Sequence, residues 1–544
     1  MNKSLTIFFV LLIHFLNAQD IPNMEVKVQE GYIPSVQESV KLNTNAIYVD
    51  TLKKDRSQDY NPNNYKYNFF YSSRKLLPAK VKSDKIYKIY NNSLALSGGY
   101  KSGPNFNFLH NSNRSKDKSY FILINHYSSG ANVKTGNIDN NFRQSQSQLD
   151  AGYKKVLSKQ ILYTHLQYSR NISSSYGNYV PINYEMLKTR FSFAKFAVSL
   201  ETTENHNFSH KSTLYISDLN ENSENISSFT SLISKNIFKF PLSFELRLEN
   251  FSNFNNAQSL NKIKSKNIFL TGITPLVKFK KYNMDFDLGF SINYQSDQGF
   301  DIFPKLISTR QLVKNVLKIK FGIEDNKYRN TYYSMYQKNP FIYTYGTNQR
   351  IIEEDTVVMD LQTTEMKQIF FELSNVLSSK DILNFEFRYG MISNFAYFDN
   401  NSFTKYNRFN VLYKDIWQSH LNFSYSKIIN EIIKLEFSSD YYNRSDNEIS
   451  HMPNLFLSFF PRINLRDKIV FSPTIKFIGP QKAFLNETKS LPSRTYFDAT
   501  LSYKYNNKLN ATLEFKNILN SKLEIWRDYK DIGFCAFIML AWSF

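Results

Sequence analysis

The first residues to consider for chemistry are His126 and Ser128, which lie two positions apart. In an extended strand such residues face the same side, so an imidazole and a hydroxyl would lie together as a base and a nucleophile do. The sequence contains no Gly-x-Ser-x-Gly turn, and no carboxylate that would orient the histidine is identifiable. We therefore interpret the pair as structural, predict no catalytic residue and no enzymatic activity, and keep a lipid hydrolase as a minor alternative.

A group of acidic residues, Glu353, Glu354 and Asp355 with Asp360 nearby, is a candidate for binding Ca²⁺. A calcium loop spaces its Asp and Asn ligands around a glycine, and this spacing is missing here, which favours a solvated acidic loop over a metal site. Phosphate-binding loops, zinc-binding His–Glu helices and dinucleotide fingerprints are also absent from the sequence. We predict neither a metal nor a cofactor.

Aromatic residues are concentrated just before this acidic group. They are Tyr332, Tyr333, Tyr336, Phe341, Tyr343 and Tyr345. Such a cluster can stack on a sugar or a peptide, but tyrosines of a membrane-interface girdle or of extended strands are the more common explanation. The sequence therefore leaves the ligand-binding residues unknown.

Composition restricts the kind of protein that could carry these residues. The chain has 544 residues, with 67 Lys and Arg against 47 Asp and Glu, a formal charge of +20. The positive residues are scattered rather than clustered, which argues against nucleic-acid binding. A mean hydropathy of −0.43 and the lack of an apolar run of ~20 residues beyond the N-terminus argue against a helical membrane bundle. The 48 Phe and 37 Tyr suit membrane strands, and the single Cys535 permits no internal disulfide.

The N-terminus has the pattern of an export signal. Lys3 supplies the positive charge, residues 5–16 form the apolar core, and Asn17-Ala18 provides a small-residue cleavage site, so residues 1–18 are predicted to be a signal peptide. Residues 19–90 contain four prolines and no sustained helical period. We expect them to form an extended segment in the periplasm or at the mouth of the following domain.

Alternation of apolar and polar residues is the dominant pattern after residue 90. In the final stretch, residues 532–544, one face carries Ile538, Leu540 and Trp542, and the residues between them face the other way. A membrane-spanning strand needs ~9–11 residues, and this stretch is long enough. We predict that it is the closing strand of a membrane β-barrel, which leaves no open sheet edge.

Short turns separate successive alternating segments, and most contain Lys or Asn. They are predicted at 114–117, 156–162, 194–195, 234–236, 281–283, 313–315, 376–383, 429–431, 466–468 and 506–508. Longer polar connectors are predicted at 128–142, 171–183, 205–225, 326–365, 394–407, 442–453 and 479–493. Short periplasmic turns and long extracellular loops are typical of outer-membrane barrels. With both termini in the periplasm, the turns predict an all-β, antiparallel barrel over residues 91–544 with about 22 strands, in a range of about 18–22.

The residues from Thr495 to Asn520 resemble the end of TonB-dependent receptor barrels, where two strands, a short turn and an Asn-Leu-type tail precede a last strand ending in Phe. Residues 95–100, Ala-Leu-Ser-Gly-Gly-Tyr, are similar to the opening of a plug-less family of such barrels. The resemblance implies a place in the outer membrane of a Gram-negative cell envelope and recognition of Phe544 by the barrel-assembly machinery. Receptors of this family carry a glycine-rich plug, whereas residues 19–90 are shorter and contain one glycine, Gly31.

These observations together predict an exported outer-membrane barrel that takes up or binds a solute, or docks periplasmic or surface proteins, with residues 19–90 partly blocking the lumen. A passive porin is the main alternative and predicts an inward-folded loop. A scaffold for surface or secretion machinery and a barrel-borne hydrolase are the others.

Overall fold

The structure is a computed structural model of the whole chain. It describes residues 90–112, 115–178, 187–203, 208–222, 224–237, 240–253, 267–342, 361–400, 407–446, 448–483 and 490–544. The predicted signal peptide and nearly all of the segment 19–90 lie outside the described residues, as do Glu353, Glu354, Asp355 and Asp360.

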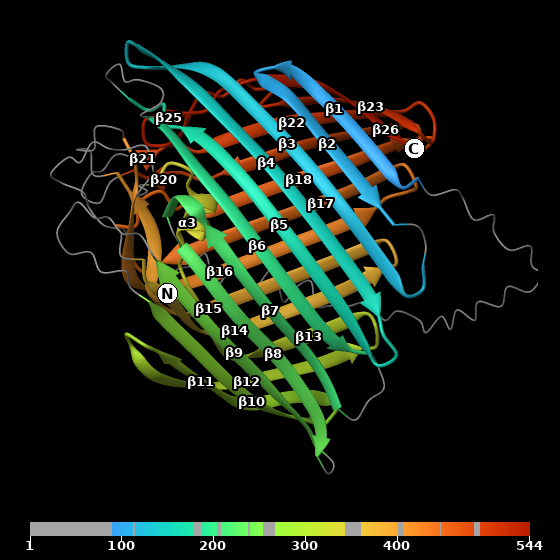
Figure 1. The fold of residues 1–544 in the computed structure, drawn as a ribbon, viewed down its shortest axis with the longest axis vertical. Coiled ribbons are helices and arrows are strands. Elements are labelled where there is room, and N and C mark those ends of the chain that lie inside the picture. Colours follow the sequence, from blue (N-terminus) through green and yellow to red (C-terminus); the bar gives the residue numbers. More distant parts are fainter. Residues whose placement is uncertain are drawn as a thin grey trace, which may run out of the picture. The chain divides into compact units, whose positions relative to one another are not determined.

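The described strands form one closed antiparallel sheet of 22 strands, which confirms the predicted barrel (Figure 1). In chain order its strands are β1 (Asn92–Tyr100), β2 (Ser102–Asn111), β3 (Lys118–Thr135), β4 (Ile138–Val156), β5 (Gln160–Ser174), β6 (Lys188–Thr202), β7 (Phe208–Leu219), β8 (Glu224–Ile237), β9 (Phe240–Asn253), β10 (Ile268–Lys281), β11 (Met284–Gln295), β12 (Gly299–Val313), β13 (Leu317–Arg329), β14 (Thr363–Ser378), β15 (Asp381–Asp399), β16 (Asn410–Ile428), β17 (Ile433–Arg444), β18 (Leu455–Leu465), β19 (Ile469–Ile478), β22 (Arg494–Lys504), β23 (Leu509–Lys516) and β26 (Cys535–Ser543). The short elements that are not part of the barrel wall are η1 (Asn220–Asn222), α3 (Tyr332–Lys338), β20 (Gln481–Lys482), β21 (Ser490–Leu491), β24 (Glu524–Trp526) and β25 (Tyr529–Lys530).

The barrel closes through its first and last strands. β26 pairs with β23 on one side and with β1 on the other. At the junction, the backbone N–H of Asn92 donates to the Phe544 carbonyl and the N–H of Phe544 donates to the Asn92 carbonyl, each over 3.0 Å. The C-terminal residue therefore completes the hydrogen-bonded ring, and neither edge of the sheet is left unpaired.

The outer face of the strands is apolar, as the alternation predicts. In β26, Ile538, Leu540 and Trp542 are half exposed on the outside, whereas Cys535 is buried on the inner side. The same phase continues into β1, where Leu96 lies opposite Leu540 and is also exposed. Because side chains of one phase share a face, this band contacts lipid while the intervening polar residues line the lumen.

Among the described residues, no helix is both long and apolar enough to cross a membrane.

Nine of the ten short turns lie at or within two residues of their predicted positions, at the end of the barrel where the C-terminus also lies (Figure 1). Several have the backbone of two-residue hairpins: Tyr282 and Asn283 have φ of 52° and 57°, and Arg466 and Asp467 have φ of 54° and 53°. Consecutive positive φ values match the right-handed twist of the adjoining strands. Because the short turns mark the periplasmic rim, the opposite rim is extracellular.

Three turn and loop positions were wrong. Residues 194–195 lie in the middle of β6, where the Lys195 ammonium faces the lumen 4.2 Å from the Tyr215 ring centroid rather than forming a turn. Residues 205–225 are not a single loop, because they include strand β7. The periplasmic turn between β6 and β7 follows Thr202. The residues 128–142 are not a loop, because β3 and β4 continue to a hairpin at Gly136, far beyond the apolar band. A lumen-facing lysine and long polar strand ends both look like loops in a sequence.

The sheet divides on the extracellular side. Pairing between β12 and β13 stops at Leu306 and Ile323, although both strands continue. Pairing between β16 and β17 stops at Gln418 and Arg444, although β15 and β16 remain paired to Asp399 and Asn410. Four strand ends are thereby separated from the wall on both sides. We call them the flap: residues 324–329, 363–368, 393–399 and 410–417.

Candidate functional site

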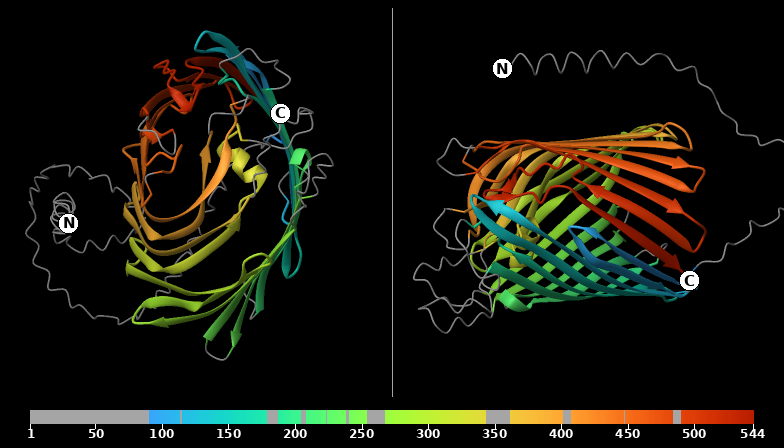
Figure 2. Two further views of the ribbon diagram at one scale, coloured as in Figure 1. Left: turned by 90° about the vertical axis from the view of Figure 1, so that its left-hand side faces the viewer. Right: turned by 90° about the horizontal axis from the view of Figure 1, so that it is seen from above.

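The flap lies across the mouth of the barrel. Figure 2 shows the ends of β13–β16, together with α3, inside the ring made by the other strands. The bend in β15 occurs where its pairing with β16 shifts between Ile392 and Phe395, and Asn394 within this bulge has a φ of +52°. A bulge of this kind bends the strand that contains it, so the bulge in β15 turns the flap toward the lumen.

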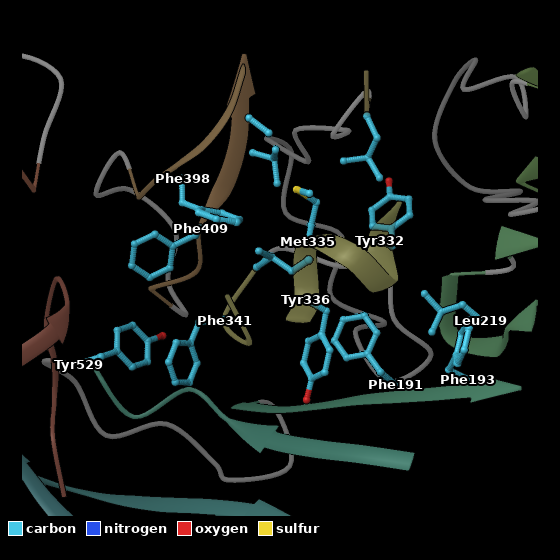
Figure 3. Close-up of a cluster of buried hydrophobic side chains, with 14 of the residues drawn as sticks. Phe191, Phe193, Leu219, Tyr332, Met335, Tyr336, Phe341, Phe398, Phe409 and Tyr529 are labelled. Atoms are coloured by element: carbon cyan, nitrogen blue, oxygen red, sulfur yellow. The ribbon is translucent and has the colours of Figure 1, made fainter. Parts of the chain in front are cut away.

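Helix α3 joins β13 to β14 on the inner side of the barrel. Thr331 caps its N-terminus by accepting from the Ser334 N–H, and the Glu224 carboxylate at the end of β8 accepts from the Tyr332 N–H. The ring centroids of Tyr336 and Phe191 lie 3.9 Å apart (Figure 3). Tyr333 stacks on Phe193 with ring centroids 3.8 Å apart. These contacts bind the helix to the inner wall at β6.

The predicted aromatic cluster therefore has a different role from the one expected. Tyr332 and Tyr336 are neither girdle residues nor part of a strand, because they lie on α3 and are buried in the lumen. Burial against the wall also removes their faces from any ligand. Tyr343 and Tyr345 lie outside the described residues.

The centre of the extracellular closure is a fully buried tyrosine, Tyr529, which begins β25. Its ring stacks on Phe341, with ring centroids 4.0 Å apart (Figure 3). It also meets the Tyr176 ring edge-on, with centroids 5.0 Å apart, and its hydroxyl donates to the Asn407 carbonyl over 2.5 Å. These residues come from four different connections between strands. We call the flap, α3 and these loops together the cap.

His451, in the loop between β17 and β18, joins three parts of the cap. Its Nδ1 lies 3.0 Å from the Phe398 carbonyl of the flap, and its Nε2 accepts from the Arg527 N–H over 3.4 Å. Its ring packs edge-on against Phe409. Burial, with a smaller contribution from the charges of Arg527 and Arg494, lowers the pKa of His451 to about 4. The ring is therefore neutral at physiological pH, as these two hydrogen bonds require.

The flap meets the inner wall through polar contacts, which we call the seam. Asn293 on β11 donates to the Asp325 carboxylate on β13 over 2.9 Å, past the intervening β12. Lys367 on β14 donates to Asp301 on β12 over 2.9 Å, and Arg247 on β9 donates to the Lys327 carbonyl over 2.6 Å. Contacts that bypass a neighbouring strand place the flap on top of the wall. A polar interface of this kind separates at a lower cost than an apolar one, because water can replace its hydrogen bonds.

A pocket of about 420 Å³ lies at the seam, within the size range of small-ligand sites. It is lined by Lys211, Thr213, Thr230, Ser231, Leu232, Glu245, Leu246, Arg247, Gly272, Thr274, Ser291, Asn293, Lys305, Asp325, Asn326 and Lys327. Lys305 and Glu245 pair across it over 3.1 Å although they lie three strands apart, which shows how strongly the wall curves here. A Cβ on Gly272 would lie 2.8 Å from the Asn293 amide oxygen, so glycine leaves room for the Asn293 and Arg247 side chains.

A belt of ion pairs covers the inner wall on β13–β15. The Arg388 guanidinium contacts Glu324 over 2.7 Å and Glu372 over 3.4 Å, and also pairs with Glu386. Lys320 contacts Glu372 over 3.0 Å. Charges at this depth of a membrane strand require water or charged partners, so the belt indicates a lumen with a polar surface.

His126 and Ser128 do not form a catalytic pair in the structure. His126 Nδ1 lies 2.9 Å from the Ser147 hydroxyl, and the Ser128 hydroxyl donates to the Pro104 carbonyl over 3.4 Å. Both residues share the outward phase of Tyr120 and Ile122 on β3. Within the described residues, no group of three His, Cys, Asp or Glu side chains is arranged to hold a metal ion.

Sequence reasoning missed the seam pocket and the cap. The pocket residues are the lumen-facing members of ordinary alternating strands, and nothing local distinguishes them. Strand length does not single out the flap, because β4 is as long as β15 and β16, at 19 residues, and stays paired with β3 to its end.

Comparisons with known proteins identify the fold. No protein-family model and no curated protein matches the sequence. A mutant of the ferric enterobactin receptor of Pseudomonas aeruginosa is 12% identical with a TM-score of 0.61, over 83% of this chain and 80% of that chain. The siderophore receptor of Acinetobacter baumannii is 11% identical with a TM-score of 0.61, over 85% and 81%. A copper transporter is 10% identical with a TM-score of 0.58, over 83% and 80%. At these identities the likeness is one of fold: this chain is an outer-membrane β-barrel.

Proposed function

We propose that this chain takes up small polar solutes across the outer membrane through the barrel lumen, with the cap as a gate at the extracellular mouth. The observation that carries the proposal is the polar seam between the flap and the wall. A permanent closure at the seam would be expected to have an apolar interface, as the contact of α3 with β6 and the centre of the cap around Tyr529 do. The ferric enterobactin and siderophore receptors and the copper transporter of the same fold support uptake as the general activity.

The gate follows from the unequal contacts of the cap. Phe191 and Phe193 hold α3 to the wall by stacked rings. Toward β9–β12, the flap is held by hydrogen bonds and one ion pair to Asn293, Arg247 and Asp301. On its β16 side, Lys414 pairs with Asp446 and Glu448, and Phe398 packs in the apolar cluster that also contains α3. The β13–β14 side of the flap therefore separates from β9–β12 more readily than α3 separates from β6, and this movement opens the pocket to the extracellular side.

A swelling assay in proteoliposomes tests this proposal with the full chain. Glucose is expected to enter, and a large dextran is not. The double variant Arg247→Ala, Lys367→Ala removes two seam contacts and should increase the rate of glucose entry. The control is Lys278→Ala, a lysine that pairs with Asp287 on the neighbouring strand, away from the seam. Swelling no faster than that of empty liposomes, for the wild type and the seam variant alike, would contradict uptake.

A passive porin is the second candidate, because α3 is an inward-folded segment of the kind that a porin predicts. The two functions differ in the resting state. A porin conducts ions steadily in planar bilayers, whereas a gated barrel shows a low open probability that rises when the seam is weakened. A high, unchanged conductance in wild type and seam variant favours the porin.

Several expectations from the sequence remain proposals with tests of their own. Residues 19–90 are proposed to narrow the lumen, so deleting them while retaining residues 1–18 should raise conductance. Phe544 is proposed to serve recognition by the barrel-assembly machinery. Docking of periplasmic or surface proteins predicts stable partners after purification from the membrane. The absence of enzymatic activity predicts that Ser128→Ala and His126→Ala change no lipid hydrolysis.

A further inference from the structure

The seam pocket has a definite chemical character, beginning with its charges. Four of its lining residues are cationic and two are acidic, but three of the four cations pair with a carboxylate. Lys305 pairs with Glu245 over 3.1 Å, and Lys211 pairs with Glu201 over 3.3 Å. Arg247 lies 4.0 Å from Glu249. The charge of Lys327 acts on Asp301 and Glu365, two carboxylates that pair directly with Lys367. An anionic ligand would have to compete with these carboxylates, so the pocket does not favour a net charge of either sign.

Hydroxyl groups lie beside the paired charges on the same face of the wall. Thr230 is directly opposite Arg247 on the neighbouring strand, and Thr274 is directly opposite Glu245. Within the described part of the chain, neither hydroxyl has a hydrogen-bond partner. Each can both donate and accept, while the ammonium and carboxylate groups keep unused donors and acceptors after pairing. The surface therefore offers many alternating donors and acceptors with little net field.

A ligand hydroxyl has the same dual capacity, so it can bond to either member of an ion pair without displacing the other. We propose that the seam pocket is a binding site for a small, uncharged, polyhydroxylated solute of monosaccharide or disaccharide size. This proposal rests on the proposed uptake function, and it names the class of substrate that is taken up. The pocket volume of about 420 Å³ fits a ligand of that size.

The pocket also couples binding to the gate. Asp325, Asn326 and Lys327 belong to the flap, whereas Thr274 and Lys305 belong to the wall. A solute in the pocket contacts both parts, so its affinity differs between the closed and the open flap. A ligand with different affinities for two states shifts their populations.

Three sugar derivatives of similar size but different charge test the proposal: glucose, the open-chain acid gluconate and the amine glucosamine. Saturation-transfer NMR on the purified full chain in detergent measures their dissociation constants. Glucose is expected to bind at least several-fold more tightly than either charged analogue. The variants Thr230→Val and Thr274→Val each remove one hydroxyl at nearly constant volume and should weaken glucose binding about fivefold. The control Ser502→Ala removes a hydroxyl of the far wall and should leave it unchanged.

Charge variants give a second, independent reading. Lys305→Gln leaves Glu245 without its partner and should shift the preference toward glucosamine, whereas Glu245→Gln should shift it toward gluconate. Two results would overturn the proposal. One is that the wild type binds gluconate more tightly than glucose; the other is that both threonine variants bind glucose as tightly as the wild type does. Glucose binding with this preference but without swelling of proteoliposomes would support the site and contradict uptake.

Discussion

Replacing Tyr529 by alanine removes the residue at the centre of the cap. The residue is fully buried, stacks on Phe341 and donates to the Asn407 carbonyl. Truncating a buried aromatic to alanine costs about 3–5 kcal/mol. If about half of this, roughly 2 kcal/mol, is lost from the closing equilibrium, the population of the open state rises about thirtyfold.

Single-channel recording in planar bilayers measures this change as open probability. Tyr529→Phe keeps the ring and removes only the hydroxyl, so the expected loss is about 1 kcal/mol and the increase about fivefold. The matched control is Tyr503→Ala, which truncates a lipid-facing tyrosine of β22 and should not change the open probability. An open probability of Tyr529→Ala equal to that of the wild type would refute the reasoning, because the cap would then not limit conduction.

Three further predictions concern pH, the close strand packing at Gly390, and assembly of the barrel in the cell. The folded-state pKa of His451 is about 4 and its usual value is 6.5, so its contribution to cap stability is complete above pH 6.5 and falls by about 3 kcal/mol as the pH falls to 4. Open probability should rise over that range, and it should rise less in His451→Gln than in the wild type. Gly390→Ala would place a Cβ 2.0 Å from the Lys367 carbonyl oxygen and should destabilise the barrel by about 1–3 kcal/mol in heat-modifiability gels, whereas Gly98→Ala, with 3.9 Å to its nearest neighbour, should not. Phe544→Ala should reduce the amount of folded barrel in cells but not refolding in detergent, since its backbone bonds remain; equal cellular amounts would contradict a recognition role.

The barrel could be predicted from the sequence because each strand carries its own signal. Alternation assigns Ile538, Leu540 and Trp542 to the lipid face without reference to any other strand. Hairpin turns such as Tyr282–Asn283 are equally local, since the positive φ values depend on residues at the turn. Ten predicted turns and two periplasmic termini give 22 strands by counting, although the false turn at 194–195 takes the place of the missed turn after Thr202.

The cap and the pocket could not be predicted because they depend on contacts between distant strands. Asn293 and Asp325 meet only because the flap folds over β12, and Lys305 meets Glu245 only because the wall curves. Within their own strands these residues are ordinary lumen-facing polar side chains. The single error among the short turns also depends on a feature beyond the local sequence. Lys195 can lie in the middle of a strand because its side chain faces the water-filled lumen.

The most direct test of the account is to lock the flap to the wall. In a Cys535→Ser background, Asn293→Cys and Asp325→Cys place one thiol on each side of the seam, and a short reducible bifunctional linker can join them. Glucose entry into proteoliposomes is then measured before linking, after linking and after reduction. The account predicts that entry stops on linking and returns on reduction. Entry at the same rate in all three states would contradict a gate at the seam.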